Sequence, residues 1–496
     1  MGFVKDIIKK RKEKKHMKKE QKDRESSILQ LYNNWKEQPE YIDAKIGERY
    51  YKGKNDILKR KKFKTVNGTV YPLPDLANNK LNHNFAKALV DQKVNYCLGK
   101  DPKFTCADEK YLDIFEKWAE ENSFSYWLNF IGLQTSNQGR AWLFCYIDET
   151  GEFRIQVFDF AECIPIWTDK LHTALKAIVR IYTTTGESLT VPNAVTHLEY
   201  WTATGKQTYS IDGDILLLEN SLFTQVSEIQ GNHDGFEPHY LNTNTACNWG
   251  KVPFVCFKNN IIEQPDVIAV KNLIDNFDLT RSDLANTLEQ LINFIITLTN
   301  AGGTDLEEFV HNLKEYGVAK LDDNAGMGGA QGIGILSQPI DCTASETHTT
   351  LLEKSIIELS QSVNLNTELK LPPSGVALKL LYQGLEIKCN GLEKQFTLAF
   401  NQFQYFFSKY VEETLGYKPT AKIKMEFQIN SIVNDNEQAD TMSKQADAFK
   451  KMKGIVSDET LLKNHPWVTD PEEELKKISH EQDDYFGKGN VIKHGL

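Results

Sequence analysis

The chain has 496 residues, 40% of them hydrophobic and 25% charged, a composition typical of a globular protein. Its length suits about two to four packed units. The net charge of -10 differs from that of a free DNA-binding protein, which usually presents a basic surface to phosphate. No segment approaches the roughly 20 consecutive apolar residues of a membrane span, so we predict a soluble protein without a membrane partner.

Positive charge is concentrated at the start of the chain. Residues 1–24 hold eleven Lys and Arg against four acids, about +7, which leaves about -17 for the rest. The few apolar residues there precede most of the charges, which argues against a secretory signal. We expect residues 1–40 to be a solvated, partly helical and partly disordered leader. Contact with nucleic acid or with another subunit is the alternative.

Residues 41–265 combine short helices with strands. Helical patterns cover 81–97 and 109–132, and residues 148–151 have the composition of a hairpin turn. The expected strands are 140–147, 153–160, 177–183, 197–202, 208–212 and 252–257. This region predicts an α+β body rich in antiparallel hairpins.

A long helix is expected after Pro265. Apolar residues recur in alternating steps of three and four from Val270 to Leu298, with Arg281 as the polar exception. Asp266 is the expected cap, and the Gly pair near residue 303 is the expected end. A helix over 267–299 would be about 50 Å long at 1.5 Å per residue, which suits a strut.

The next residues, 300–342, predict a small insert with a short helix, a strand near 318–321, a mobile tip over 322–332 and a strand over 334–340. A second long helix should follow, because Thr343 and Glu346 have capping-box spacing and apolar residues continue to Val363.

The Pro- and Gly-containing segment 364–375 predicts a loop, after which Ser374 can cap a third long helix that ends near Leu415. Its continuous apolar stripe predicts the main core helix. A strand near 421–429 and acidic C-terminal helices, one capped by Asp470, should follow.

Eight cysteines are scattered without a C-x-x-C pair, so we expect reduced, buried thiols and neither disulfides nor a zinc site. The cysteines are at positions 97, 106, 145, 163, 247, 256, 342 and 389.

Motifs for nucleotide or metal chemistry are missing from the sequence. The glycine-rich stretch 326–334 lacks the G-x-G-x-x-G register, and no Gly-Lys pair meets the P-loop spacing. A metal site at His233 and His239 is conceivable, but solvated loop histidines are the favoured interpretation, as for His172, His197, His311 and His348. We therefore predict a protein that is not an enzyme and that binds no cofactor or metal.

Short motifs in a consistent order resemble the portal proteins of siphophages that infect Gram-positive bacteria. They include YKG at 51–53, KVNYCLGK at 93–100, WGKVPF at 249–254, KNN at 258–260, KNLID at 271–275, SDLAN at 282–286 and SGVALK at 374–379. The resemblance runs along nearly the whole chain. The basic leader and the glycine-rich tip depart from it.

The resemblance implies a dodecameric ring with a central DNA channel at one capsid vertex. It assigns the regions as a wing (41–265), stem helices (266–299 and 343–363), a clip (300–342), a channel loop (364–375), a long wing helix with a strand (376–430), a helical crown (431–486) and a disordered tail (487–496). Without the resemblance, 364–375 would be interpreted as an ordinary helix connector.

The resemblance also implies roles for polar residues. Those expected to face DNA in the channel loop are Asn364, Asn366, Thr367, Glu368 and Lys370. Those expected to bind partners at the clip are Asp322, Asp323, Asn324, Met327 and Gln331. Those expected on the stem helix are Asp275, Asp278, Arg281 and Asp283. For the stem acids, helix-dipole contacts and inter-subunit salt bridges are the expected roles.

The implied function is passive: the ring conducts double-stranded DNA during packaging, retention and ejection, while a terminase motor hydrolyses ATP. Further implied partners are the major capsid and scaffolding proteins and the head-completion adaptors, with assembly in the bacterial cytoplasm and residence in the virion. The alternatives are a portal-associated adaptor or minor capsid protein, which would lack paired stem helices, and an enzyme acting on nucleic acid, which would need a buried carboxylate cluster.

Overall fold

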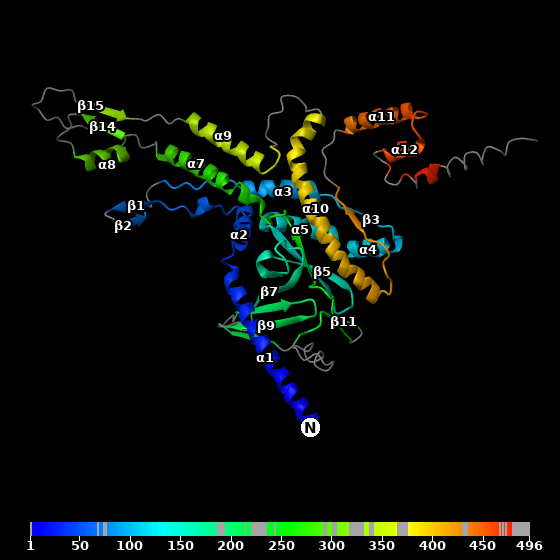
Figure 1. Cartoon of the computed structure of the whole chain (residues 1–496). Helices are drawn as coiled ribbons and strands as arrows, with labels where there is room; N and C mark the ends of the chain where they lie inside the picture. The colour runs from blue at the N-terminus through cyan, green and yellow to red at the C-terminus, as the bar shows by residue number, and fades with distance from the viewer. Residues whose placement is uncertain are drawn as a thin grey trace, which may run out of the picture. The chain divides into compact units, whose positions relative to one another are not determined.

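The computed structural model confirms a mixed α+β fold (Figure 1). It divides into two compact units, one formed by residues 1–367 and 382–430 and the other by residues 368–381 and 431–496. The described residues are 2–66, 69–72, 77–185, 194–213, 215–219, 236–242, 245–290, 295–299, 305–316, 332–336, 342–364, 375–428, 435–465, 468, 471 and 474–478.

The N-terminal leader is a helix whose last part belongs to the protein core. Helix α1 runs from Gly2 to Trp35, and Ile28 and Trp35 are buried against the first unit's largest sheet. The indole Nε1 of Trp35 donates a hydrogen bond of 3.1 Å to the carbonyl oxygen of Ala161. The expectation of a solvated leader over 1–40 is therefore wrong for this part. Burial of two large apolar side chains releases more free energy than the conformational entropy that the helix loses when it docks.

The largest sheet is antiparallel, with the order β10-β9-β8-β7-β6. Its inner face packs under α1 through Val179, Leu198 and Tyr209. The strands are β6 (Cys163–Trp167), β7 (Leu175–Thr185), β8 (Ala194–Trp201), β9 (Lys206–Asp212) and β10 (Ile215–Leu218).

A second antiparallel sheet has the order β13-β4-β5, with β4 at Arg140–Ile147, β5 at Phe153–Phe158 and β13 at Phe254–Lys258. The expected hairpin between β4 and β5 is confirmed, and Gly151 takes the positive φ of 84° that its turn requires. Smaller antiparallel pairs are β1 (Phe63–Val66) with β2 (Thr69–Pro72), β11 (Tyr240–Asn242) with β12 (Thr245–Cys247), and β3 (Lys103–Thr105) with β16 (Lys424–Glu426).

Four helices accompany these sheets: α2 (Pro39–Tyr51), α3 (Phe85–Leu98), α4 (Glu109–Glu121) and α5 (Phe124–Gln138). The single helix expected over 109–132 is thus two helices. The break lies at Ser123, which has a left-handed φ of 51°. The apolar pattern continues across it because Phe115, Trp118 and Phe124 all join one aromatic cluster. Short 3-10 helices lie at Asp56–Lys59 (η1), Phe160–Glu162 (η2) and Asp266–Ala269 (η3).

The main core helix is confirmed as α10, from Gly375 to Thr414. Its residues Phe396, Phe403 and Phe407 are fully buried. Phe403 lies 5.6 Å from the ring of Trp118, and Phe407 lies 5.6 Å from the ring of Phe153, measured between centroids. Aromatic contacts of this kind stabilise the fold beyond the burial of apolar area, so this part of α10 is the central core helix of the first unit.

The second unit contains the C-terminal helices α11 (Asp435–Met452) and α12 (Asp458–Lys463). Within it, Phe449 packs on His465 with the ring centroids 4.5 Å apart. Ser457 caps α12 by accepting a hydrogen bond from the Thr460 amide. The expected cap at Asp470 and the tail at 487–496 lie outside the described residues. Among the helices that the structure describes, none combines the length and apolar character needed to cross a bilayer.

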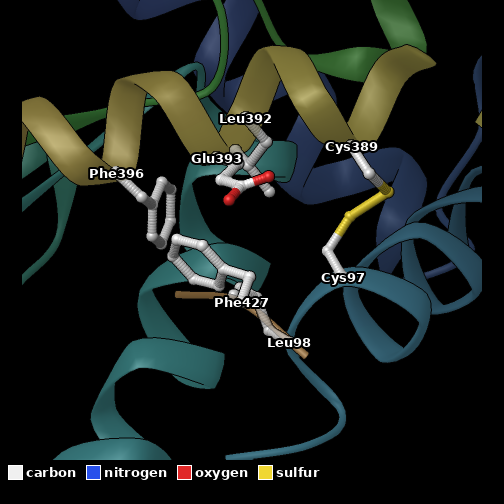
Figure 2. A pocket seen from close by; sticks show the side chains of 7 residues that line it. All are labelled: Cys97, Leu98, Cys389, Leu392, Glu393, Phe396 and Phe427. Atoms are coloured by element: carbon white, nitrogen blue, oxygen red, sulfur yellow. A yellow bond between two sulfur atoms is a disulfide. The ribbon is translucent and has the colours of Figure 1, made fainter. Parts of the chain in front are cut away.

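A disulfide joins Cys97 of α3 to Cys389 of α10, with the Cα atoms 5.8 Å apart (Figure 2). The expectation of reduced thiols is therefore wrong for this pair, since 292 residues separate two cysteines that only the tertiary fold brings together. For Cys145 and Cys163 the expectation of buried thiols is confirmed, and burial raises the pKa of both. Figure 2 shows the disulfide beside a small apolar hollow that Leu98, Leu392 and Phe396 help to line.

Candidate channel-forming region

The first of the two long helices expected to form the stem is shorter than expected. Helix α7 spans Lys271–Gln290, and residues Ile295–Thr299 form strand β14, which pairs antiparallel with β15 (Gly332–Leu336). The helix predicted over 267–299 is therefore wrong beyond Gln290. The sequence at 295–299 is Ile-Ile-Thr-Leu-Thr, whose β-branched residues favour a strand once a partner strand is available.

The insert between the two long helices contains β14, β15 and the helix α8 (Leu306–Tyr316). The expected short helix is thus confirmed, and the last strand begins at Gly332 where residue 334 was expected. The expected strand at 318–321 and all the proposed clip residues lie outside the described residues: Asp322, Asp323, Asn324, Met327 and Gln331.

The second long helix is confirmed as α9, from Cys342 to Leu359. Thr343 lies inside this helix, so the expected capping box does not begin it. Helices α7 and α9 lie side by side in Figure 1. Their shared core comprises Val270, Ile274 and Phe277 from the α7 side, Leu352 and Ile356 from α9, and Tyr50, Ala86 and Leu89 from α2 and α3. The first part of the helix pair therefore packs against α2 and α3 of the same chain.

Asp275, on α7, belongs to a charged network with the end of α2. It accepts hydrogen bonds from the Tyr50 hydroxyl and, at 2.6 Å, from the Lys271 ammonium. Lys271 also lies 2.8 Å from Asp56, which in turn pairs with Arg49 at 2.8 Å. Burial opposes ionisation of Asp56, but hydrogen bonds from Lys271 and Arg49 lower its pKa strongly.

Asp278 lies one turn further along α7 and is fully buried. Its carboxylate accepts hydrogen bonds from the Asn55 side chain at 2.7 Å, from the His83 backbone amide at 2.9 Å and from the His83 ring at 2.8 Å. Burial raises its pKa against the effect of these donors.

Asp283 pairs with Arg60 at 2.7 Å, and Arg281 is half-buried. Asp275, Asp278 and Asp283 thus all have partners within their own chain, and the expected inter-subunit salt bridges stay a prediction.

A buried ionic cluster lies where the α+β body meets α7. Asp266 is 2.9 Å from Lys93 of α3 and 3.4 Å from Lys388 of α10, and it accepts a hydrogen bond of 2.9 Å from Asn259. Lys93 is 1% exposed. Burial lowers its pKa to about 8, whereas for Asp266 the two lysines outweigh burial and lower the pKa to about 2. Asp266 lies inside η3 and does not cap the helix, so its predicted capping role is wrong.

Comparison with protein families matches residues 31–487 to the family described as "Phage portal protein, SPP1 Gp6-like". The chain belongs to this family. It is 32% identical over 454 residues to the portal protein of Clostridium phage phiCD119, covering 88% of this chain and 93% of the relative. It is 28% identical over 452 residues to the portal protein of Bacillus phage SPP1, covering 90% of this chain and 85% of the relative. The resemblance inferred from the motifs is confirmed.

Of the residues proposed for the channel loop, only Asn364 is described, and it is half-buried at the end of the turn that follows α9. Asn366, Thr367, Glu368 and Lys370 lie outside the described residues. Their role in this portal-family chain stays a prediction.

The ionic cluster was not predicted from the sequence, although Lys93 and Asn259 lie within motifs that carry the family resemblance. One signal was available. Lys93 interrupts an apolar pattern at Leu89, Val90 and Val94, and a lysine on such a face needs a buried counter-charge. The identity of that counter-charge, 173 residues away, has no local signature.

The histidines are structural rather than solvated in three cases. His172 pairs with Glu263 at 2.8 Å and His197 with Glu219 at 2.8 Å, so the solvated interpretation is wrong for both. His348 is exposed, as expected, and His233 lies outside the described residues. Within the described ranges, no group of three or more His, Cys, Asp or Glu side chains is placed to share a metal ion.

His239 is the third structural histidine and makes stability depend on pH. Its ring lies 5.8 Å from that of Trp201, its Nδ1 accepts a hydrogen bond of 3.1 Å from the Trp249 amide, and burial lowers its pKa from 6.5 to about 4. The unfolded chain therefore binds a proton more readily than the folded chain between pH 6.5 and 4, so this contribution to stability is lost as the pH falls through that window.

The variant His239→Asn keeps an acceptor for Trp249 and cannot titrate there. Between pH 6.5 and 4 we expect it to lose about 1–3 kcal/mol less unfolding free energy than the wild type, measured by urea unfolding at each pH. His348→Asn is the exposed control and should follow the wild type. Equal losses in His239→Asn and the wild type would show that His239 does not titrate in this range.

Proposed function

We propose that this chain forms the ring-shaped portal of a tailed phage, through which double-stranded DNA is packaged, retained and ejected. The observation that carries the proposal is the family match over residues 31–487. The helix pair α7 and α9, with a small α/β insert between them, supports it, because an adaptor that only binds the portal has no need of such a pair. We assign the ring to one capsid vertex and its copy number to twelve.

The regions take the roles of the family. The α+β body is the wing, α7 and α9 the stem, the insert the clip, the segment 364–375 the channel loop, and α11 and α12 part of the crown. The terminase motor binds at the clip and hydrolyses ATP there. Head-completion adaptors bind there after the motor. Capsid and scaffolding proteins contact the wing, and assembly takes place in the host cytoplasm.

Charge is compatible with a conduit. Each firm Lys or Arg contact with phosphate adds salt-dependent affinity, and such affinity would resist sliding. Outside the first 24 residues the chain carries about -17, so the ring as a whole does not hold DNA tightly. The channel loop, as proposed, contributes neutral polar side chains and the single charge pair of Glu368 and Lys370.

Electron microscopy of the purified protein tests the ring directly. We expect cyclic particles of about twelve copies with a hole wide enough for a duplex, and light scattering should give the matching mass. A monomer or dimer that persists at all salt and protein concentrations would contradict the proposal that the chain forms a pore. It would favour the alternative of an adaptor or minor capsid protein.

Deleting residues 364–375 tests the channel loop. If two or three glycines bridge α9 and α10, we expect rings of normal symmetry, because the described stem contacts lie outside the deleted segment. DNA packaged per head, or DNA retained after packaging, should fall by about tenfold or more. Normal packaging and retention by such rings would show that this segment does not act on DNA.

A further inference from the structure

The turn that follows α9 is bonded to the side chain of one glutamine on α3. The Gln92 side-chain amide donates to the carbonyl oxygen of Val363 at 3.0 Å, and its oxygen accepts from the Val363 amide at 2.9 Å. A primary amide that satisfies both backbone groups of one residue replaces the pairing that a strand would supply. Val363 is 6% exposed, so without Gln92 these backbone groups would be poorly hydrated.

A second residue holds the same turn from α10. The Lys388 ammonium donates to the carbonyl oxygen of Ser360 at 3.1 Å, while it also faces Asp266 of the ionic cluster. Ser360 is 4% exposed. The turn is therefore tied to α3 on one side and to α10 on the other.

The backbone between these two contacts is strained. Gln361 has a φ of 56°, in the left-handed region where a helix end usually has glycine. A residue with a side chain is strained there, and such conformations persist where the surroundings impose them. Opposite Gln361 stands Gly384 of α10, where an added Cβ would lie 3.7 Å from the Cα and the carbonyl oxygen of Gln361. Helix α10 is thus in van der Waals contact with this residue, and the two hydrogen-bonded anchors flank it on either side.

Helix α3 contacts the turn after α9 and also contacts α10. Besides Gln92, it presents Cys97 to Cys389 in the disulfide, and the ring of Tyr96 stacks on Tyr382 with the centroids 5.7 Å apart. Helix α3 therefore contacts both the turn where the chain leaves α9 and the part of α10 that belongs to the first unit. This helix lies in the wing and not in the stem.

We propose that Gln92 and Lys388 are positioning residues, which impose the left-handed turn at 360–363 and thereby set the direction in which the chain leaves the stem helix α9. The inference rests on the proposed function, because that direction matters to DNA only if the ring is a conduit. It assigns to α3 the task of holding the stem exit in register with the wing.

Gln92→Met and Gln92→Glu test the proposal. Methionine keeps the length of the side chain and loses both hydrogen bonds, whereas glutamate still accepts from the Val363 amide but cannot donate to its oxygen. In assembled rings we expect hydrogen exchange of the Val363 amide to quicken by about tenfold in Gln92→Met and by less in Gln92→Glu. Asn95→Ala, an exposed amide one turn further along α3, should leave it unchanged.

The same rings are then assayed for DNA packaged and retained per head. A several-fold loss in Gln92→Met, a smaller loss in Gln92→Glu and none in Asn95→Ala support the proposal. Unchanged exchange at Val363 in Gln92→Met overturns it, whatever the packaging yield. Faster exchange with normal packaging overturns the claim that this turn positions chain relevant to DNA. Absence of rings in the wild type would instead contradict the proposed function.

Discussion

Replacing Asp266 by alanine is expected to lower the free energy of unfolding by about 3–5 kcal/mol, because it leaves the buried Lys93 and the half-buried Lys388 without this counter-charge. Lys93 donates to Asp266 at 2.9 Å, and Lys388 lies 3.4 Å away. Burial already lowers the pKa of Lys93 with Asp266 present, so without the carboxylate Lys93 should deprotonate or the cluster should open to water. Either outcome loosens the junction of α3, α7 and α10.

Urea unfolding followed by tryptophan fluorescence measures the loss. Asp266→Asn should cost nearly as much as Asp266→Ala, since the amide keeps the shape but not the charge. Asp101→Ala, at an exposed acid after α3, is the control and should change stability by no more than about 0.5 kcal/mol. The double variant Lys93→Met with Asp266→Leu should recover part of the loss, because apolar residues of similar volume often replace a buried ion pair without penalty. An Asp266→Ala protein as stable as the wild type would contradict the ionic role.

Asp278→Ala should lower the free energy of unfolding by about 2–4 kcal/mol. The substitution deprives the Asn55 side chain, the His83 amide and the His83 ring of one shared acceptor. It also leaves a void beside the His83 ring, which packs on Phe277 of α7 with the ring centroids 4.8 Å apart. The expected result is a looser contact between α7 and the segment 55–83.

Asparagine at the same position separates charge from hydrogen bonding. Burial raises the pKa of Asp278, which means that burying its ionised form costs free energy. Asp278→Asn removes the charge and this cost, and its amide oxygen can still accept a hydrogen bond from His83. We expect this variant to cost about 1 kcal/mol, in contrast to Asp266→Asn. Asp283→Ala, which removes a half-exposed pair with Arg60, should cost less than about 1 kcal/mol. Equal costs for the asparagine variants at 266 and 278 would mean that the two carboxylates do not differ in this way.

Local sequence patterns predicted helices and strands correctly where one face of the element packs against a core. The stripe on α10 and the hairpin of β4 and β5 are examples, because a period of 3.6 or 2 is already present in the residues themselves. Residues 295–299 show the limit of such patterns. A short apolar run fits a helix or a strand equally well, and pairing with β15, more than 30 residues away, decides for the strand.

Residue patterns alone predicted the α+β class, the two long helices around a small insert, the main core helix and, through ordered motifs, the portal family. All of these depend on local periodicity or on short motifs and their order along the chain. The folded chain was needed to see that Trp35 anchors the leader, that Cys97 bonds to Cys389, and that Lys93, Asp266 and Lys388 form one cluster. Such contacts join residues far apart in the chain, and their energies arise only when folding removes water from both partners.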